Sequence, residues 1–81
     1  MLEQLADPDK RCVGTKQVLR AIENGQAACV FIAGDAESHI RQRITNACAD
    51  AGVETVEVDS LQELGHACHI QVGAATACIL L

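Results

Sequence analysis

Residues 27–33, "AACVFIA", form an unbroken apolar run. A short apolar run between polar segments is typical of a strand that other elements cover on both faces. Strands of that kind belong to sheets that carry helices on either side. Residues 27–33 are therefore expected to form a central, buried strand.

The segment before this strand, "GTKQVLRAIENG" (residues 14–25), has the pattern of a short helix. Its apolar positions recur at helical spacing, at Val18, Leu19 and Ile22. Thr15 is a candidate N-cap, and Gly25 stands where a left-handed residue often ends a helix. Further upstream, "RCVG" predicts a short edge strand, and "MLEQLADPDK" predicts a helical turn that Pro8 stops.

Helical and strand patterns continue to alternate after residue 33. A helix is predicted between the "GDAES" loop and Gly52, and Asp35 and Ser38 are its candidate N-caps. Its apolar face consists of Ile40, Ile44, Ala47, Cys48 and Ala51. The next segment, "VETVEVD" (residues 53–59), alternates apolar and acidic residues and predicts a strand with one solvated face.

The last segments complete the alternation. Ser60 and Glu63 in "SLQELGHAC" match a capping box at the start of a helix, and "AATACILL" (residues 74–81) predicts a final apolar strand. Four repeats of helix followed by strand predict an α/β fold, a three-layer α/β/α sandwich with a small mixed sheet of about four strands. Without repeats or linkers, residues 1–81 are expected to form a single domain.

Basic residues are concentrated in one window of an acidic chain. The net charge is −5, yet four of the six basic residues lie between residues 10 and 20, a window without acids. These residues are Lys10, Arg11, Lys16 and Arg20. They predict a local basic patch, which is the electrostatic footprint of a nucleic-acid binder. Phe31 is the single aromatic residue, which argues against a base-stacking platform.

The five cysteines form no CxxC pair and have mostly apolar neighbours, which predicts buried thiols in a reducing compartment. No apolar run approaches membrane length, and a cytoplasmic protein that does not contact a membrane is expected. His66, Cys68 and His69 resemble a set of metal ligands. However, a second ligand pair is missing, and His66 and Cys68 would lie on different helix faces. No metal or other cofactor is therefore expected.

Two segments are candidate binding sites. "GTKQ" places Lys16 and Gln17 in a first helical turn, where backbone N–H groups and the helix dipole favour phosphate or acceptor atoms of bases. It lacks the spacing of a phosphate loop, and a solvated helix face remains the plain alternative. In "HIQVGAA", Ile70 and Val72 are bulky residues in a short connection. The pattern alone favours their packing inward at the start of the last strand.

Taken in order, "GTKQVLRAIENG", "VFIAGDAE" and "LGHACHIQVGAAT" resemble the three signature segments of the ribosomal L-seven-Ae (L7Ae) superfamily. The resemblance covers nearly the whole chain and is strongest to short bacterial paralogues. It implies an α/β/α sandwich that binds kink-turn RNA, in which tandem sheared G·A pairs adjoin a three-nucleotide bulge. It also implies a protein without enzymatic activity that acts as a monomer, with ribosomal RNA among its candidate targets.

The resemblance also implies roles for particular residues. Gly14, Thr15, Lys16 and Gln17 would enter the widened major groove and read the guanines, and Arg20 would reach the backbone. The loop of Ile70, Gln71 and Val72 would cover the bulged nucleotides. Asp35 matches an acidic position that supports or touches the RNA.

One departure from the resemblance is His69, since related chains often have glycine there, which allows a left-handed backbone. The acidic balance is a second departure and implies a shallow salt dependence of RNA binding. Two other functions stay open. The chain could be a protein-interaction module of the same fold that has lost RNA binding, or a small-molecule-binding α/β domain with Cys68 as a nucleophile. The absence of a phosphate loop and of an acid–base pair counts against the latter.

Overall fold

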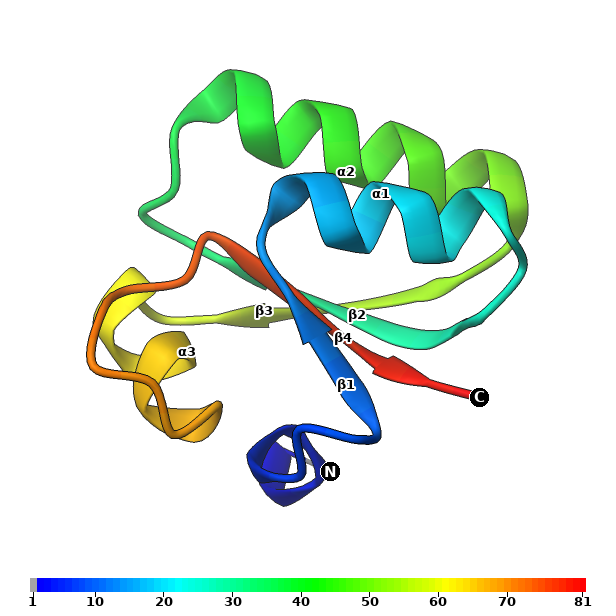
Figure 1. The fold of residues 1–81 in the computed structure, drawn as a ribbon. Helices are drawn as coiled ribbons and strands as arrows, with labels where there is room; N and C mark the ends of the chain where they lie inside the picture. The colour runs from blue at the N-terminus through cyan, green and yellow to red at the C-terminus, as the bar shows by residue number, and fades with distance from the viewer. Residues whose placement is uncertain (1) are drawn as a thin grey trace.

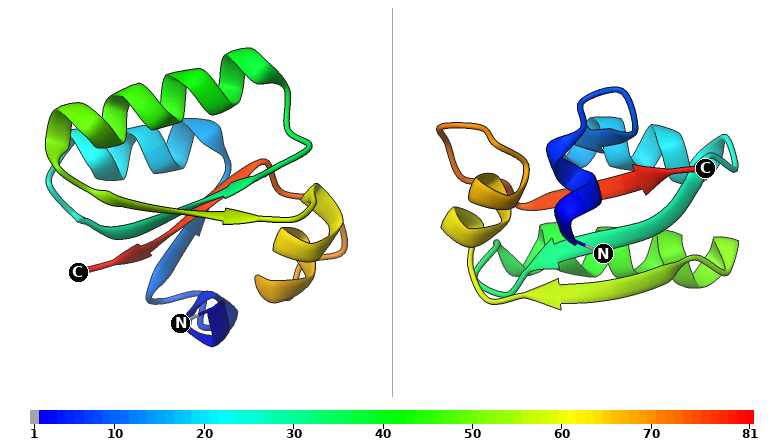
Figure 2. Two further views of the ribbon diagram at one scale, coloured as in Figure 1. Left: turned by 180° about the vertical axis from the view of Figure 1, so that it is seen from behind. Right: turned by 90° about the horizontal axis from the view of Figure 1, so that it is seen from below.

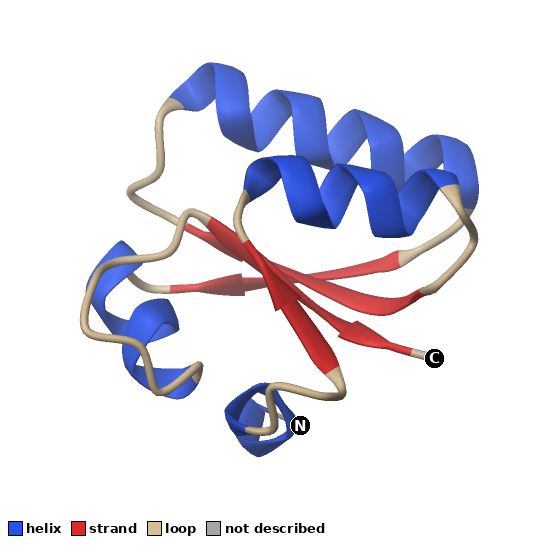
Figure 3. Cartoon of the chain, viewed as in Figure 1, coloured by secondary structure: helices blue, strands red, loops and turns tan. Residues whose placement is uncertain are grey.

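The structure, a computed structural model, describes residues 2–81 (Figures 1 and 3). In chain order its elements are η1 (Leu2–Ala6), β1 (Arg11–Val13), α1 (Thr15–Glu23), β2 (Ala27–Ala33), α2 (Ser38–Ala51), β3 (Glu54–Val58), α3 (Leu61–Ala67) and β4 (Thr76–Leu80). The helical turn expected near the N-terminus is the short 3-10 helix η1; Met1, which that prediction included, lies outside the described residues. The expected alternation of helix and strand is confirmed.

The four strands form one mixed sheet in the order β1-β4-β2-β3. β2 is parallel to β3, whereas β4 is antiparallel to both of its neighbours, β1 and β2. The last strand in chain order therefore lies in the interior of the sheet, as both views in Figure 2 show. β1 and β3 are the edge strands. On one face of β3, Thr55 and Glu57 are exposed, whereas on the other face Val56 is half-buried and Val58 is buried, which confirms the expected solvated face.

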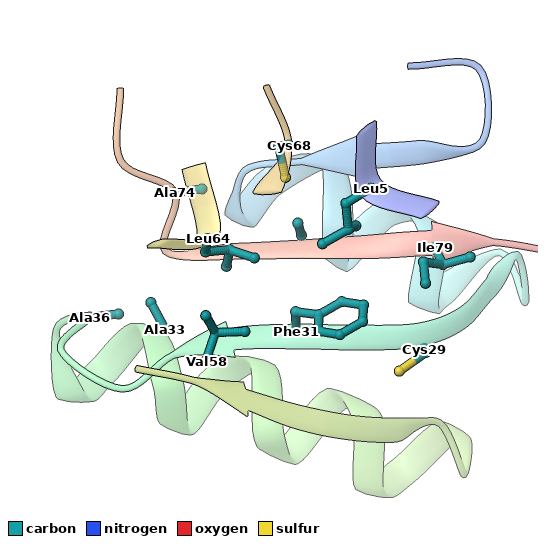
Figure 4. Packing of buried hydrophobic residues seen from close by; sticks show 11 residues of the cluster. Leu5, Cys29, Phe31, Ala33, Ala36, Val58, Leu64, Cys68, Ala74 and Ile79 are labelled. Atoms are coloured by element: carbon teal, nitrogen blue, oxygen red, sulfur yellow. The ribbon is translucent and has the colours of Figure 1, made fainter. Parts of the chain in front are cut away.

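Helices cover both faces of the sheet, which confirms the three-layer α/β/α sandwich (Figures 1 and 2). Under α1 and α2 lies one apolar cluster, which includes Val18, Val30 and Ile44. Against η1 and α3 lies the other cluster, in which Phe31 is fully buried together with Leu64 (Figure 4). β2 contributes to both clusters, because its side chains alternate between the two faces.

All three α-helices end in the same hydrogen-bonded motif. In each, a residue with positive φ follows the helix, and its N–H and the next N–H bond back to carbonyls of the last turn. That residue is Gly25 after α1 (φ 69°), Gly52 after α2 (φ 68°) and His69 after α3 (φ 58°). After α3, His69 N–H donates to the His66 carbonyl at 3.0 Å and Ile70 N–H donates to the Gly65 carbonyl at 3.1 Å.

The helix starts differ from the sequence-based expectations in two of three cases. α1 begins at Thr15 with Gly14 as its N-cap, so the prediction that Thr15 caps this helix is wrong. α2 begins after Glu37, and neither Asp35 nor Ser38 caps it. α3 follows the prediction, because Ser60 Oγ accepts a hydrogen bond from Glu63 N–H at 3.0 Å.

Candidate functional site

Three connections meet at one end of the sheet, at the left of Figure 1: the β1–α1 turn, the β2–α2 loop and the α3–β4 loop. Backbone hydrogen bonds hold them to the start of β4. Gly14 N–H donates to the Thr76 carbonyl at 3.0 Å, and Ala33 N–H donates to the Ala75 carbonyl at 2.9 Å. Each of the three segments that carry the family resemblance therefore contributes a connection to the same end of the sheet.

The start of α1 has no side-chain cap. Gly14 adopts φ 100° and ψ 149°, and no acidic residue lies in the first turn. The first N–H groups of a helix have no intrahelical partner, so they favour an anion or an acceptor atom in front of them. Lys16 and Gln17 are exposed in this turn. The arrangement is open to a negatively charged ligand.

A basic groove continues from this helix start between α1 and α2. It is lined by Thr15, Lys16, Leu19, Arg20, Glu23 and Arg43. Arg43 was not predicted from the sequence as a site residue. A signal was nevertheless present, because Arg43 follows Ile40 by three positions and precedes Ala47 by four, next to the stripe of α2 that packs inward.

The predicted basic patch of residues 10–20 is divided by the fold, so that expectation is only partly right. Arg11 is half-buried on the other side of the sheet, where its guanidinium donates to the Leu5 carbonyl at 3.0 Å and the Cys68 carbonyl at 3.1 Å. Arg11 thus ties η1 and the end of α3 to β1. The basic groove instead combines two cations of α1 with Arg43 of α2.

The α3–β4 loop presents its side chains in two directions. Ile70 is half-buried and packs against the apolar cluster under α3. Gln71 is exposed, and Val72 is 71% exposed. Because β4 begins only at Thr76, the expectation that Ile70 and Val72 start this strand is wrong, and Val72 does not pack inward.

Gly65 of α3 holds this loop close to the helix. A Cβ atom at Gly65 would overlap the Val72 carbonyl oxygen, so only glycine permits this contact. Ala74 N–H also donates to the Leu61 carbonyl at 3.0 Å. Between loop and helix lies a hollow lined by Leu61, Gln62, His66, Ile70, Gln71, Val72 and Gly73. Gln62 and His66 were not selected from sequence as binding residues.

Asp35 supports α3 rather than the helix that follows it. Its Oδ1 accepts a hydrogen bond from Leu61 N–H at 2.7 Å. Leu61 in turn lies close to Gly73 of the α3–β4 loop. Asp35 therefore bonds to Leu61 while its side chain remains exposed to solvent at this end of the sheet.

The cysteine and histidine cluster is dispersed. His66 and His69 are exposed while Cys68 is fully buried, which confirms that neighbouring members face different ways. Burial raises the pKa of the Cys68 thiol, and a nucleophilic cysteine needs the opposite shift. Among residues 2–81, no three His, Cys, Asp or Glu side chains are grouped to hold a metal ion.

The remaining thiols follow the expected burial. Cys29, Cys48 and Cys78 are also buried, whereas Cys12 is half-buried.

In the described part of the chain, no helix is long and apolar enough to cross a bilayer.

Comparisons with known proteins agree with this geometry. The family model described as the ribosomal protein L7Ae/L30e/S12e/Gadd45 family matches residues 1–80. The chain is 50% identical over 70 residues to "RNA-binding protein TTE2299" of Caldanaerobacter subterraneus, covering 86% of this chain and 85% of that protein. It is 44% identical over 78 residues to "RNA-binding protein YbxF" of Geobacillus stearothermophilus, covering 96% and 95% respectively.

The fold comparison gives the same result. The solved structure of a 15.5 kD RNA-binding protein of Giardia lamblia superposes with a TM-score of 0.89 at 31% identity. The match covers 99% of this chain and 68% of that one. The chain therefore belongs to the ribosomal protein L7Ae/L30e/S12e/Gadd45 family.

Proposed function

We propose that this protein binds RNA, and that it recognises the kink-turn and stabilises its bent form. The observation that carries the proposal is the uncapped start of α1, which lies at the same end of the sheet as the exposed α3–β4 loop. Relatives that match most of the chain are named RNA-binding proteins, which supports an RNA ligand. The proposed contact residues are Gly14, Thr15, Lys16, Gln17, Arg20, Asp35, Ile70, Gln71 and Val72.

The start of α1 supplies the polar part of the proposed interface. Ordinary A-form RNA hides the base edges of its major groove, so a protein reads irregular sites where the groove is widened. A guanine presents two acceptors there, O6 and N7, and the exposed Lys16 and Gln17 can donate to such atoms. Arg20 and Arg43 line the groove that continues from this turn, and we expect them to neutralise backbone phosphates.

The α3–β4 loop supplies the apolar part. Ile70 is anchored in the core, so it fixes the position of the neighbouring Val72, whose side chain is exposed. An exposed valine on a held loop offers an unstacked base an apolar surface, which shields it from water. Gly65 and the hydrogen bonds at the end of α3 keep this loop in place before RNA arrives, which lowers the ordering cost of binding.

Binding of this kind changes the RNA population rather than its chemistry. A kink-turn is marginally stable alone, and a protein that binds only the bent form shifts the equilibrium toward it. No catalytic group is needed for this, and we propose a non-enzymatic protein that acts as a monomer. Ribosomal RNA and regulatory RNA are the target classes that a member of this family would meet.

The test uses a short duplex with a kink-turn and dyes at both ends, so that energy transfer reports bending. A matched duplex has its G·A pairs replaced by Watson–Crick pairs. We expect binding and bending of the first duplex only. Equal affinity for both duplexes would overturn kink-turn recognition. No binding to either duplex would overturn RNA binding as well and favour a protein-interaction module.

Two lysine-to-alanine variants test which surface of the protein binds RNA. Lys16→Ala should weaken binding about 10-fold or more, as for the loss of a base contact. Lys10→Ala is the matched control, because this exposed lysine lies at the opposite end of β1 and its loss should leave affinity unchanged. With Lys16, Arg20 and Arg43 as phosphate or groove contacts, the logarithm of affinity should fall with the logarithm of salt at a slope of about −3 or shallower.

A further inference from the structure

Cys12 of β1 and Cys78 of β4 are directly opposite each other in the antiparallel register. Residues directly opposite in such a pair point to the same side of the sheet. Their Sγ atoms are 2.8 Å apart, and one thiol donates a hydrogen bond to the other. Both side chains belong to the apolar cluster under α1 and α2.

The backbone at this pair suits a disulfide. Gly14 N–H donates to the Thr76 carbonyl, and Leu80 N–H donates to the Lys10 carbonyl, so hydrogen-bonded pairs lie two residues to either side. The Cys12–Cys78 pair therefore belongs to the hydrogen-bonded class, in which Cα atoms are about 5.5 Å apart. Disulfides join Cα atoms that are roughly 4.4–6.8 Å apart, and the Cα spacing of this class of pair lies within that range.

The two thiols differ in access and in acidity. Cys12 is half-buried and lines a surface hollow with Gln17, Arg20 and Asn24, whereas Cys78 is fully buried. The hydrogen bond between the two thiols lowers the pKa of Cys12, and the charge of Arg11 adds to this effect. The same hydrogen bond, together with burial, raises the pKa of Cys78. Cys12 is thus the more acidic and the more accessible of the two thiols, and Cys78 is the buried thiol behind it.

We propose that Cys12 and Cys78 form a redox modification site, at which a peroxide converts the two thiols into a cross-strand disulfide that a thiol reductant reverses. Cysteines that sense oxidants share these features, an accessible thiolate beside a resolving thiol. Disulfides that form reversibly are also the kind found in reducing compartments. The bridge would join the strand that leads into α1 to the strand that follows the α3–β4 loop.

The reaction balances with hydrogen peroxide as the oxidant. The Cys12 thiolate attacks one peroxide oxygen, the O–O bond breaks, and Cys12 sulfenic acid and hydroxide form. Cys78 sulfur then attacks Cys12 sulfur, the S–S bond forms, and the leaving hydroxide takes the Cys78 proton as water. In total, two thiols lose two electrons and two protons, and one peroxide becomes two waters.

The test treats the full chain with one equivalent of hydrogen peroxide, followed by intact mass spectrometry and peptide mapping without reduction. We expect the monomer to lose the mass of two hydrogen atoms, with residue 12 linked to residue 78, and dithiothreitol to restore the original mass. Trypsin leaves Cys48, Cys68 and Cys78 in one peptide, since no Lys or Arg follows Arg43. Mapping therefore depends on single variants.

Cys12→Ser and Cys78→Ser should each abolish the bridge. Cys68→Ser is the matched control, because Cys68 is buried in the cluster on the other face of the sheet, and this variant should still form it. If circular dichroism shows that Cys78→Ser is unfolded, the test of the bridge uses Cys12→Ser alone, because Cys12 is only half-buried. A bridge between another pair, a covalent dimer, or Cys12 that accumulates as sulfinic acid in the unmutated chain would overturn the proposal. The readout is the mass of the protein, so the result is independent of RNA binding.

Discussion

The carboxylate of Asp35 and the backbone N–H of Leu61 are joined by a hydrogen bond of 2.7 Å, which connects the β2–α2 loop to the first residue of α3. The first N–H groups of a helix lack intrahelical partners, so this bond satisfies one of them. Ser60 satisfies a second. Two separate segments therefore cap a helix of seven residues.

The first prediction follows from that bond. Asp35→Ala should lower the free energy of unfolding by about 1 kcal/mol, as for the loss of a helix-capping oxygen. Urea unfolding followed by circular dichroism measures the change. Asp35→Asn keeps a hydrogen-bond acceptor, so its free energy of unfolding should fall by less than that of Asp35→Ala. Glu37→Ala is the control, because Glu37 precedes α2 without a capping bond from its side chain and should change stability little. Equal losses in Asp35→Ala and Glu37→Ala would refute the capping role.

The second prediction concerns His69, which has φ 58° where the other two helices end in glycine. A left-handed conformation costs a residue with a side chain about 1 kcal/mol relative to glycine. His69→Gly should therefore raise the free energy of unfolding by up to about 1 kcal/mol. His66→Gly, an exposed histidine inside α3, should lower it by about the same amount, because glycine is unfavourable within a helix. Thermal unfolding of the two variants should move in opposite directions, and a shift in the same direction would contradict the argument.

The third prediction separates stability from RNA binding at Gly65. Gly65→Ala forces the Val72 carbonyl away from α3, because the added Cβ would overlap the carbonyl oxygen. We expect a loss of about 1–3 kcal/mol in stability, typical of overpacking, and weaker kink-turn binding. Gly25→Ala is the control. It also strains a positive φ, in open space at the far end of α1, and should lose stability without losing RNA affinity. Normal RNA binding by Gly65→Ala would show that the loop position does not matter.

The fourth prediction concerns Val72. Since its side chain is 71% exposed, Val72→Ser should change the free energy of unfolding by no more than about 0.5 kcal/mol. It should nevertheless weaken kink-turn binding, because a polar side chain shields an unstacked base less well. Leu81→Ser, at a position that is 86% exposed, is the matched control and should bind RNA normally. Identical affinities for these two variants would remove Val72 from the interface.

The fifth prediction is a loss of stability at alkaline pH. Burial raises the pKa of Cys29, Cys48 and Cys68 in the folded protein. A thiol whose folded pKa is raised contributes stability below its unfolded pKa of about 8.5, and this contribution disappears as pH rises through the folded value. The lowered pKa of Cys12 acts in the opposite direction, but for a single group. In the presence of a reductant, the urea midpoint should therefore fall above about pH 8.5.

A variant that lacks one buried thiol tests whether these thiols cause the loss of stability at alkaline pH. Cys48→Ala should show a shallower loss of stability with pH, by up to about 1.4 kcal/mol per pH unit. The comparison uses slopes, so a lower absolute stability of the variant does not affect it. If the slopes of the variant and the unmutated chain coincide, Cys48 does not contribute to the alkaline effect.

The helices and strands could be predicted from local patterns, because the residues that determine each one are adjacent in the sequence. The apolar run at residues 27–33 and the capping pair Ser60 and Glu63 describe their own surroundings, and both were predicted correctly. The direction of a cation depends instead on strand register and on distant partners. Arg11 was therefore assigned to a basic patch, although it bonds to the Leu5 and Cys68 carbonyls across the sheet.

In the candidate site, too, positions set by the local pattern were predicted correctly, and positions set by tertiary packing were not. Lys16 and Gln17 lie where the helical pattern placed them, in the first turn of α1. Arg43 was missed as a groove residue, because the packing of α2 beside α1 is a tertiary relationship. Asp35 was expected to cap the next helix in the chain, but it bonds to α3, whose position the sheet order determines.

The interior position of β4 affects how the protein matures on the ribosome. Among the described strands, β1 and β2 do not pair with each other and are joined through β4, whose residues 76–80 are made after β1, β2 and β3. Until those residues have left the exit tunnel, β1 has no strand partner and both apolar clusters are incomplete. The nascent chain should therefore complete its fold late, in one cooperative step, and a ribosome stalled before residue 76 should present a protease-sensitive chain.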